Sequence, residues 1–408
     1  MRILIYGLNF APELTGIGKY TGEMAAWLAD RGHEIKVVTA PPYYPQWQVQ
    51  SGYSSLKYRS ESIDGVWVCR CPLWVPHRPS GLKRLLHLKS FAVTSLLPLL
   101  WLALRRRPDV ILMVEPTGFC IPGAWLAARI GGAALWLHVQ DFELDAAFDL
   151  GILRGRPLRR GLLALERFWM RRFDRVSTIS ERMLERLAGK AVPPDRRILF
   201  PNWVDTQAIK PMAEVSALRP ELGIPDATVV ALYAGNLGAK QGLEILVQAA
   251  QRLLGRKDLL FVICGEGGER QTLQTQAQGL GNMRFLPLQP LPRLNTLLNL
   301  ADIHLLPQRQ DAEDLVMPSK LTGMLASGKP VIATTQPDSQ VGKVVSGCGI
   351  LTRPGDAAEF AAAILRLADS PQERQVLGAR ARRFAETHLD KERILGSLET
   401  QLLACARR

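Results

Sequence analysis

The stretch "YAGNLGAKQG", residues 233–242, holds three glycines and one cation between an apolar run and a helix-like pattern. Glycine tolerates positive φ and lets the backbone approach a ligand without a Cβ in the way. A helix N-terminus that follows a strand offers free N–H groups and a partial positive charge, which suit a phosphate. The glycines and Lys240 therefore indicate either a tight turn into a helix or a phosphate-binding turn.

A second candidate lies in "DAEDLVMPSKLTGMLASGKPVIATT", residues 311–335. Pro318 and Ser319 are ordinary residues for a helix start. Lysine is disfavoured there by the helix dipole, so the position of Lys320 indicates an anionic partner.

Two further turns place glycines between a strand and a helix. In "CGEGGERQTL", residues 264–273, the carboxylate of Glu266 repels phosphate, which leaves a hydroxyl or amine ligand, or a plain tight turn. In "LTGIGKYTG", residues 14–22, Gly16 and Gly18 precede Lys19. The third glycine comes one position late for a dinucleotide fingerprint, so we expect a loop that presses against a phosphate or a sugar.

These turns need strands and helices to position them, and short apolar runs alternate with amphipathic stretches along the whole chain. Strands are expected at 2–10, 34–40, 66–71, 109–115, 133–141 and 175–180, then at 228–236, 259–267, 283–288, 302–308, 329–334 and 349–353. The alternation predicts an α/β protein with two doubly wound, Rossmann-like domains that face each other across a cleft. Ligands of such sheets bind beyond the carboxyl ends of the strands. We expect domains at 1–202 and 203–385 and a C-terminal helical segment at 386–408, which could cap the second domain or return across the cleft.

Composition agrees with a two-domain globular enzyme. The chain has 408 residues, 47% hydrophobic and 22% charged, enough for two ordinary domains. Its six cysteines form no CxxC pair, which argues against a zinc site or disulfide framework and favours the cytoplasm. The N-terminus lacks a signal-peptide pattern. The charge-free run 90–104 is shorter than the about 20 residues that a membrane span needs, and Pro98 interrupts it, so we expect no transmembrane helix.

The positive charge is uneven. Of the net +13, residues 1–200 carry +11, from 28 Lys and Arg against 17 Asp and Glu. Basic residues interleaved with Leu, Phe and Trp in "RPSGLKRLLHLK" and "RGRPLRRGLLALERFWMRR" indicate a face that lies on an anionic membrane surface. Nucleic acid is the rival partner, but no nucleic-acid module accompanies the charge, so none is expected. A merely solvated basic face is the third interpretation.

The segments "ELTGIGKYTGEMAAWLADRGHEIKVVT", "PNWVD", "YAGNLGAKQGLE", "CGEGGER" and "LVMPSKLTGMLASGKPVIAT" together resemble a bacterial glycosyltransferase of family 4, with the GT-B fold, over about residues 1 to 400. The resemblance implies a retaining transfer of a sugar from a nucleotide-sugar donor in the second domain to a lipid-diphosphate-linked sugar acceptor in the first. It also implies exopolysaccharide biosynthesis of the colanic acid type, with fucose from GDP-fucose as a candidate, by a cytoplasmic protein peripheral to the inner face of the cell membrane.

The resemblance also implies roles for individual residues. The donor-binding set is Gly235, Asn236, Lys240, Gln241, Gly242, Gly265, Glu266, Ser319 and Lys320. The catalytic candidates are Asp141, His138 and Asp314. The acceptor or phosphate loop is Gly16, Gly18 and Lys19.

This sequence departs from the family pattern at several of these positions. Asn236 and Gln241 stand where members often have Arg and Lys, and the usual pair of glutamates is absent, with Asp314 the nearest substitute. Gln140 occupies the place of a histidine that often precedes Asp141. His138 lies two residues before Gln140, so in a strand the two side chains share a face, and a core histidine is the alternative to a catalytic one.

Because the glycine turn supplies only Lys240, we expect Lys320 to complete a clamp on the donor diphosphate. No Asp-x-Asp pair is present, so no metal or cofactor is expected beyond the nucleotide-sugar co-substrate, and stabilisation of the leaving group falls to these cations. Two other functions stay open: a nucleotide-sugar epimerase of the same fold, and a non-catalytic basic binding protein.

Overall fold

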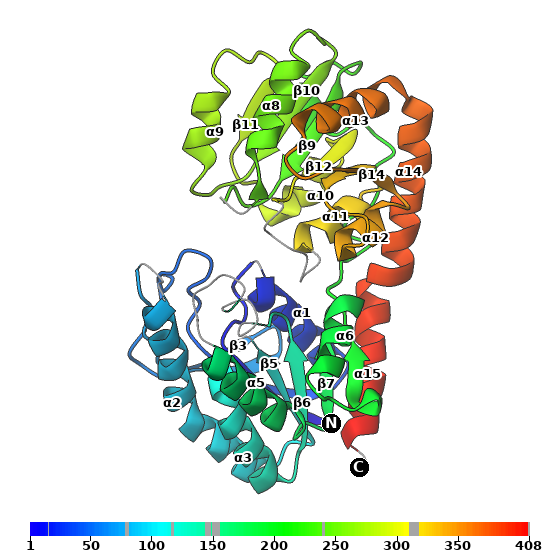
Figure 1. Ribbon diagram of the computed structural model, residues 1–408. Helices are drawn as coiled ribbons and strands as arrows, with labels where there is room; N and C mark the ends of the chain where they lie inside the picture. The colour runs from blue at the N-terminus through cyan, green and yellow to red at the C-terminus, as the bar shows by residue number, and fades with distance from the viewer. Residues whose placement is uncertain are drawn as a thin grey trace. The chain divides into compact units, whose positions relative to one another are not determined.

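A computed structural model describes residues 1–14, 16–77, 81–115, 118–142, 148, 156–238, 241–309 and 318–406. The chain divides into two compact units (Figure 1). The first comprises Met1–Pro201 and Ile394–Arg408, and the second comprises Asn202–Arg393. The boundary expected after residue 202 lies one residue from this division. The expected C-terminal segment divides differently, because its first residues belong to the second unit and the rest to the first.

The first unit is built on an eight-stranded sheet in the order β3-β4-β2-β1-β5-β6-β7-β8, parallel except for the antiparallel pair β3–β4. Its strands are β1 (Arg2–Gly7), β2 (Glu34–Thr39), β3 (Arg59–Ile63), β4 (Val66–Arg70), β5 (Val110–Glu115), β6 (Ala134–Val139), β7 (Arg175–Thr178) and β8 (Arg197–Leu199). Its helices are α1 (Gly16–Asp30), α2 (Gly81–Arg106), α3 (Ile121–Gly131), α5 (Arg156–Met170), α6 (Glu181–Gly189) and most of α15 (Lys391–Ala406).

The second unit is built on a fully parallel six-stranded sheet in the order β11-β10-β9-β12-β13-β14. Its strands are β9 (Val229–Ala234), β10 (Leu259–Cys264), β11 (Met283–Leu286), β12 (Ile303–Leu306), β13 (Val331–Thr334) and β14 (Gly349–Thr352). Its helices are α7 (Leu218–Glu221), α8 (Glu244–Arg252), α9 (Arg270–Gln276), α10 (Leu294–Leu298), α11 (Ser319–Ala326), α12 (Gln340–Val345), α13 (Ala357–Asp369) and α14 (Pro371–Phe384).

Both sheets are doubly wound, as the alternating pattern predicts. In the second sheet, successive residues of β9 point to opposite faces: Ala231 and Tyr233 join one apolar cluster, and Val230 and Leu232 join the other. Burial on both faces explains why these strands read as continuous apolar runs. The strand order reverses at β1 in the first unit and at β9 in the second, and such a switch point is where ligands bind in these sheets.

Helix α2 corrects the expectation for the run 90–104. It spans 26 residues and continues through Pro98. A proline cannot donate to the carbonyl four residues before it, here that of Thr94, but the Tyr58 hydroxyl donates to this carbonyl at 2.8 Å and satisfies it.

By length and composition, α2 is the one helix of the described residues that could cross a membrane, and a third of its most apolar window is buried within the protein. The buried face contributes Phe91 and Leu99 to the core of the first unit, and the Ser95 hydroxyl lies 2.7 Å from that of Tyr6 on β1. One face of α2 therefore packs on the core of the first unit.

The last helix, α15, belongs to the first unit from Ile394 onward. It buries Leu395, Leu398 and Leu402. Its Glu399 carboxylate lies 2.8 Å from His33 Nε2, just beyond the end of α1. The C-terminal segment therefore packs on the first unit.

Candidate active site

In the second unit, the turns that follow β9 and β10 lie backbone against backbone. The amide of Gly235 donates to the Cys264 carbonyl at 2.9 Å, and that of Leu237 donates to the Glu266 carbonyl at 2.8 Å. A Cβ on Gly265 would lie 1.9 Å from the Gly235 carbonyl oxygen. Close packing of the two turns therefore requires glycine at 265.

Lys320 reaches this region from the first turn of α11. Its ammonium donates to the Tyr233 hydroxyl at 3.1 Å and to Gln241 Oε1 at 2.8 Å, and lies 4.4 Å from the centre of the Tyr233 ring. Among the residues that the structure describes, no carboxylate lies within ion-pair distance of it.

The protein packed around this ammonium lowers the pKa of Lys320 to about 7, although the residue as a whole is partly exposed. Desolvation disfavours the charged form of an amine, and the described oxygens that contact this one are neutral. A cation held in this way gains its missing partner when an anion binds, and perturbed groups of this kind gather at functional sites.

The neutral residues of the β9 turn hold the lysine in place. Gln241 supplies the amide oxygen that Lys320 contacts, and the Asn236 carbonyl accepts a hydrogen bond from the Tyr233 hydroxyl at 2.7 Å. Gln241, at a position where the family often has a cation, thus supplies a neutral acceptor to the lysine of α11.

A cavity of about 520 Å³ lies beside this turn. It is lined by Gly242, Glu244, Gln248, Gln308, Arg309 and Gly355, among others. Gly242 has a φ of 64°, and a Cβ there would lie 3.1 Å from Arg309 Cγ. Sequence reasoning missed Arg309. The signal that could have found it is a cation just beyond β12, the strand beside β9 at the switch point.

The other residues predicted to bind the donor or act on it lie in different surroundings. Lys240 and Asp314 lie outside the described residues. The exposed carboxylate of Glu266 pairs with Arg270 at 3.2 Å. Ser319 opens α11 with an exposed side chain, and its carbonyl accepts from the Thr322 hydroxyl at 2.8 Å.

In the first unit, the β1–α1 turn closes on a buried carboxylate. Gly16 has a φ of 60°, and a Cβ on Gly18 would lie 2.5 Å from Glu13 Oε2. The predicted cation Lys19 instead pairs with Glu23, one turn along α1, at 3.0 Å.

Glu13 itself is 3% exposed. Its Oε1 accepts from the amides of Tyr43 and Tyr44 at 3.0 Å each, and its Oε2 accepts from Asn9 Nδ2 at 2.9 Å. Burial raises the pKa of Glu13, and these hydrogen bonds oppose the rise. Glu13 therefore links the β1–α1 turn to the segment after β2 by hydrogen bonds, a role that no local sequence motif predicts.

His138 lies in the core of the first unit. Its Nε2 lies 2.9 Å from Gln140 Nε2, and its Nδ1 lies 2.9 Å from Ser177 Oγ. This confirms that His138 and Gln140 share a face. Because an amide N–H can only donate, Nε2 accepts and Nδ1 carries the proton.

Burial lowers the pKa of His138 to about 3, so the ring is neutral. With both nitrogens engaged inside the core, it positions Gln140 rather than meeting a substrate. Of the two interpretations of this residue, the core histidine is the one that these contacts favour.

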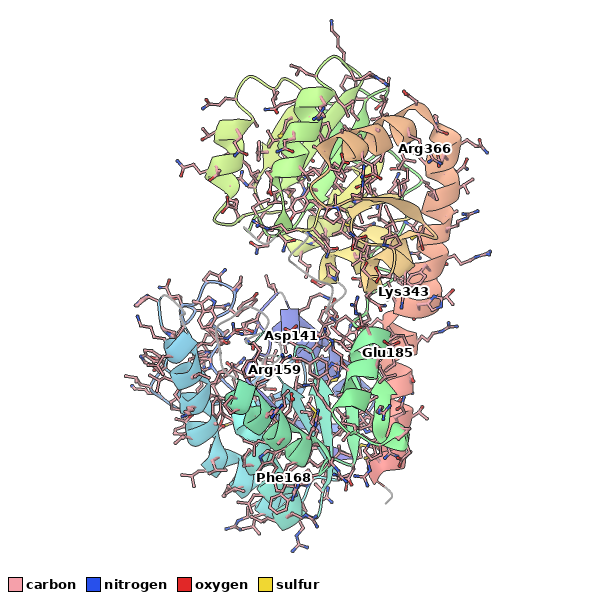
Figure 2. All side chains as sticks on the ribbon, viewed as in Figure 1. Asp141, Arg159, Phe168, Glu185, Lys343 and Arg366 are labelled. Carbon is pink, nitrogen blue, oxygen red and sulfur yellow. The ribbon has the colours of Figure 1, made fainter. Side chains whose placement is uncertain are left out.

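Asp141 is exposed just beyond β6, at the carboxyl end of the first sheet, where Figure 2 labels it. Burial raises the pKa of Tyr44, the charge of Asp141 adds to the rise, and that of Arg84 on α2 opposes it. A Cβ on Gly16 would lie 3.8 Å from the Tyr44 ring. Asp141, Tyr44, Arg84 and Gly16 thus gather at one end of this unit. The tyrosine and arginine were not predicted.

Within the described residues, no group of three or more His, Cys, Asp or Glu side chains is arranged to hold a metal ion.

Comparison with known proteins gives consistent matches. Residues 15–203 match the family described as a glycosyl transferase 4-like domain, and residues 228–370 match glycosyl transferases group 1. The chain is 45% identical over 407 residues to WcaI of Escherichia coli strain K12, a glycosyl transferase assigned to colanic acid biosynthesis, covering 97% of this chain and 98% of that protein.

Two solved structures share the fold. Sucrose-phosphate synthase of Thermosynechococcus elongatus superposes with a TM-score of 0.73 at 18% identity, over 99% of both chains. Anabaena HepE, solved in complex with UDP-glucose, gives 0.68 at 17% identity, over 99% of this chain and 100% of that one.

Proposed function

The chain belongs to the glycosyltransferases of family 4 with the GT-B fold, and from that premise we propose that it transfers a sugar from a nucleotide-sugar to a lipid-diphosphate-linked acceptor in exopolysaccharide biosynthesis of the colanic acid type. The second unit holds the donor and the first unit the acceptor.

One observation carries the donor half of this proposal: within the described residues, the ammonium of Lys320 at the switch point of the second sheet is bonded to neutral oxygens and to no carboxylate. A donor diphosphate would supply an anionic partner. Arg309, which follows β12 and lines the cavity at Gly242, offers a second cation from the neighbouring strand. Charge-assisted bonds from such groups stabilise the nucleoside diphosphate as it leaves, without a metal.

The acceptor half is supported by the group around Asp141. The carboxylate can accept a hydrogen bond from an acceptor hydroxyl, and Tyr44 and Gly16 lie on the same side of the unit. In a retaining transfer on one face of the sugar, an oxygen of the donor phosphate takes the acceptor proton, so no protein base is required. His138 is neutral and buried, and it acts on this site only through Gln140.

The identity of the sugar is proposed from the similarity of this chain to WcaI. Identity of 45% over nearly the full length of WcaI supports the same pathway for this chain, and GDP-fucose is the donor that we propose first. The complex of HepE with UDP-glucose shows that a protein of this fold takes a nucleotide-sugar.

A lipid-linked acceptor lies in a membrane, and α2 presents a face suited to contact with that membrane. Opposite its buried face, α2 exposes Leu86, Val93 and Leu97, and Lys83, Arg84 and Lys89 share the helix. Arg159 and Phe168 lie on α5 (Figure 2), and the guanidinium of Arg172, two residues beyond the end of α5, packs 3.3 Å from the centre of the Phe168 ring. Apolar groups with adjoining cations are the pattern of a protein that lies on an anionic membrane from the cytoplasmic side.

The experiment is to identify a product. Purified protein is incubated with a lipid-diphosphate-linked sugar and, in separate reactions, with GDP-fucose, other GDP-sugars or UDP-sugars. Mass spectrometry identifies the lipid product, and NMR gives the anomeric configuration of the new linkage. We expect one donor to lengthen the acceptor by one sugar with retained anomeric configuration. Conversion of the nucleotide-sugar into its epimer without an acceptor would assign the epimerase reaction instead, and an inverted product would contradict the retaining mechanism.

The same assay tests the proposed absence of a metal. Transfer should continue in excess EDTA, because the side chains of Lys320 and Arg309 take the place of a metal ion at the donor diphosphate. Loss of activity that Mg²⁺ or Mn²⁺ restores would contradict this.

A further inference from the structure

The first unit contains an apolar cavity of about 340 Å³ beside the N-terminal half of α2, a volume in the range of small-ligand pockets. Trp47, Leu56, Leu73, Trp74, Ser90 and Thr94 line it, among others. Its walls come from α2 and from the segments that follow β2 and β4. None of its lining residues belongs to the group around Asp141.

The polar atoms that α2 contributes to this wall already have partners. Ser90 Oγ accepts from the Trp74 amide at 3.1 Å and donates to the His87 carbonyl at 2.7 Å. The Thr94 hydroxyl donates to the Pro72 carbonyl at 2.6 Å. Three further polar side chains belong to the described lining: those of Gln48 and His77 are exposed, and that of Ser55 is partly exposed. The interior wall thus offers an occupant carbon rather than hydrogen bonds, so a hydrocarbon fits it better than a sugar.

An aromatic cluster fixes the shape of this wall. Trp47 has a φ of 54°, a region that bulky residues rarely adopt. Its ring lies 5.6 Å from that of Tyr43 and 5.3 Å from that of His87, and His87 Nδ1 lies 2.7 Å from the Trp74 carbonyl. Backbone strain persists only where the surroundings hold it, so the cavity is preformed.

The surroundings point to an occupant with an anionic head and an apolar tail. Residues seven apart lie on the same side of a helix, which puts Lys83 on the side of Ser90. The exposed Leu86, Val93 and Leu97 follow the adjoining side of α2. Arg84, whose charge acts on Tyr44, links this end of α2 to the group around Asp141.

We propose that the cavity receives the first isoprenoid units of the lipid-diphosphate-linked acceptor, while the cations of the first α2 turns face its diphosphate. This inference rests on the proposed function. It adds that the enzyme recognises the lipid chain itself and does more than lie on the membrane that contains it.

The test uses water-soluble acceptors, so that membrane binding plays no part. The same sugar diphosphate is prepared with a methyl group or with a geranyl chain of two isoprene units, and each is assayed with the full chain without detergent. Burial of the chain should lower the KM for the geranyl acceptor by roughly tenfold or more, with similar kcat.

Two variants locate the effect. Trp74→Ala, at a residue 45% exposed, and Leu56→Ser, at a residue 83% exposed, remove parts of the wall with little risk to the fold. Each should raise the KM for the geranyl acceptor and leave that for the methyl acceptor unchanged. The matched control is Trp101→Ala, an α2 tryptophan 53% exposed and outside the cavity, which should change neither.

Calorimetric binding of geranyl diphosphate keeps this test separate from that of the proposed function. Binding that Trp74→Ala weakens and Trp101→Ala does not supports the cavity even if no sugar is transferred, in which case only the transfer reaction is refuted. No binding, a KM independent of chain length, or loss of binding for a free oligosaccharide in Trp74→Ala would overturn the inference, and the last outcome would assign the cavity to carbohydrate.

Discussion

The first turn of each sheet is closed around one ionisable side chain, and the two turns treat charge in opposite ways. In the first unit, Glu13 accepts two backbone amides and the Asn9 side chain. In the second, Lys320 donates to the Tyr233 hydroxyl and to the Gln241 amide oxygen. The carboxylate has a full set of donors from the protein, whereas the ammonium has no charged partner among the described residues.

This difference separates a structural group from a binding group. The hydrogen bonds of Glu13 join two loops of its own unit, so its removal should lower the free energy of unfolding. Lys320 lies in surroundings that disfavour its charge, so its removal should weaken binding of the donor. Two similar folds can thus carry an ionisable residue at corresponding turns, in one case for stability and in the other for ligand binding.

The largest expected effect is on stability. Glu13→Ala leaves the Tyr43 and Tyr44 amides without their acceptor, at about 1–3 kcal/mol for each unpaired buried group, so the free energy of unfolding should fall by about 2–6 kcal/mol. Glu13→Gln keeps an acceptor oxygen and should lose much less. Urea unfolding followed by circular dichroism measures both.

The control for Glu13 is Glu23→Ala, which removes a partly exposed carboxylate paired with Lys19 in the same unit. It should lose under about 1 kcal/mol. If Glu13→Ala were no worse than this control, Glu13 would not be the tie between the two loops.

The next effect is on the donor. Lys320→Met removes the charge-assisted bonds, worth about 1.5–3 kcal/mol each, and should weaken nucleotide-sugar binding by roughly tenfold to a hundredfold. Lys343→Met, at an exposed lysine of α12 in the same unit (Figure 2), is the matched control and should bind the donor normally. Unchanged affinity in Lys320→Met would refute this donor site.

The same variant should alter how stability depends on pH. The pKa of Lys320 is lowered to about 7 in the folded protein, so between there and its unfolded value of about 10.4 the unfolded chain binds more protons. Stability then rises with pH through this window. The wild type should gain stability relative to Lys320→Met as the pH increases from about 7 to about 10, and parallel curves would show that the folded lysine titrates normally.

The smallest effects per residue are expected on the surface of the first unit. Changing Lys83, Arg84 and Lys89 to Gln removes about 1 kcal/mol of attraction to an anionic membrane for each residue. Flotation with anionic vesicles should fall in this variant and at high salt, whereas neutral vesicles should bind little protein in any case. Equal flotation with both kinds of vesicle would favour a solvated basic face with no membrane role.

The sequence predicted the strands that are buried and missed those that are not. All six strands of the second sheet follow apolar runs, whereas β3 is largely exposed and β8 is a partly exposed strand of three residues, so no apolar run marks either. Pro98 was misjudged because its orphaned acceptor is satisfied by Tyr58, which is distant in sequence.

The site was predictable only where local chemistry was unusual. A lysine at a helix start drew attention to Lys320, but its contact with Tyr233 spans 87 residues and could not be foreseen. Glu13 and Arg309 carry no such mark, because their importance comes from contacts that only the folded chain creates. The shared face of His138 and Gln140 was foreseeable, since strand periodicity alone fixes it.

The central claim is that the Lys320 side chain binds the anionic diphosphate of the donor. The most direct test is to count the protons taken up when the donor binds. Calorimetric titration with the nucleotide-sugar, at about pH 8.5 in buffers of different ionisation enthalpy, gives this number. With a free-enzyme pKa of about 7, the lysine starts mostly neutral and should be protonated as the diphosphate binds. We expect uptake of close to one proton in the wild type and in Lys343→Met, and almost none in Lys320→Met. Donor binding without proton uptake in the wild type would contradict the account.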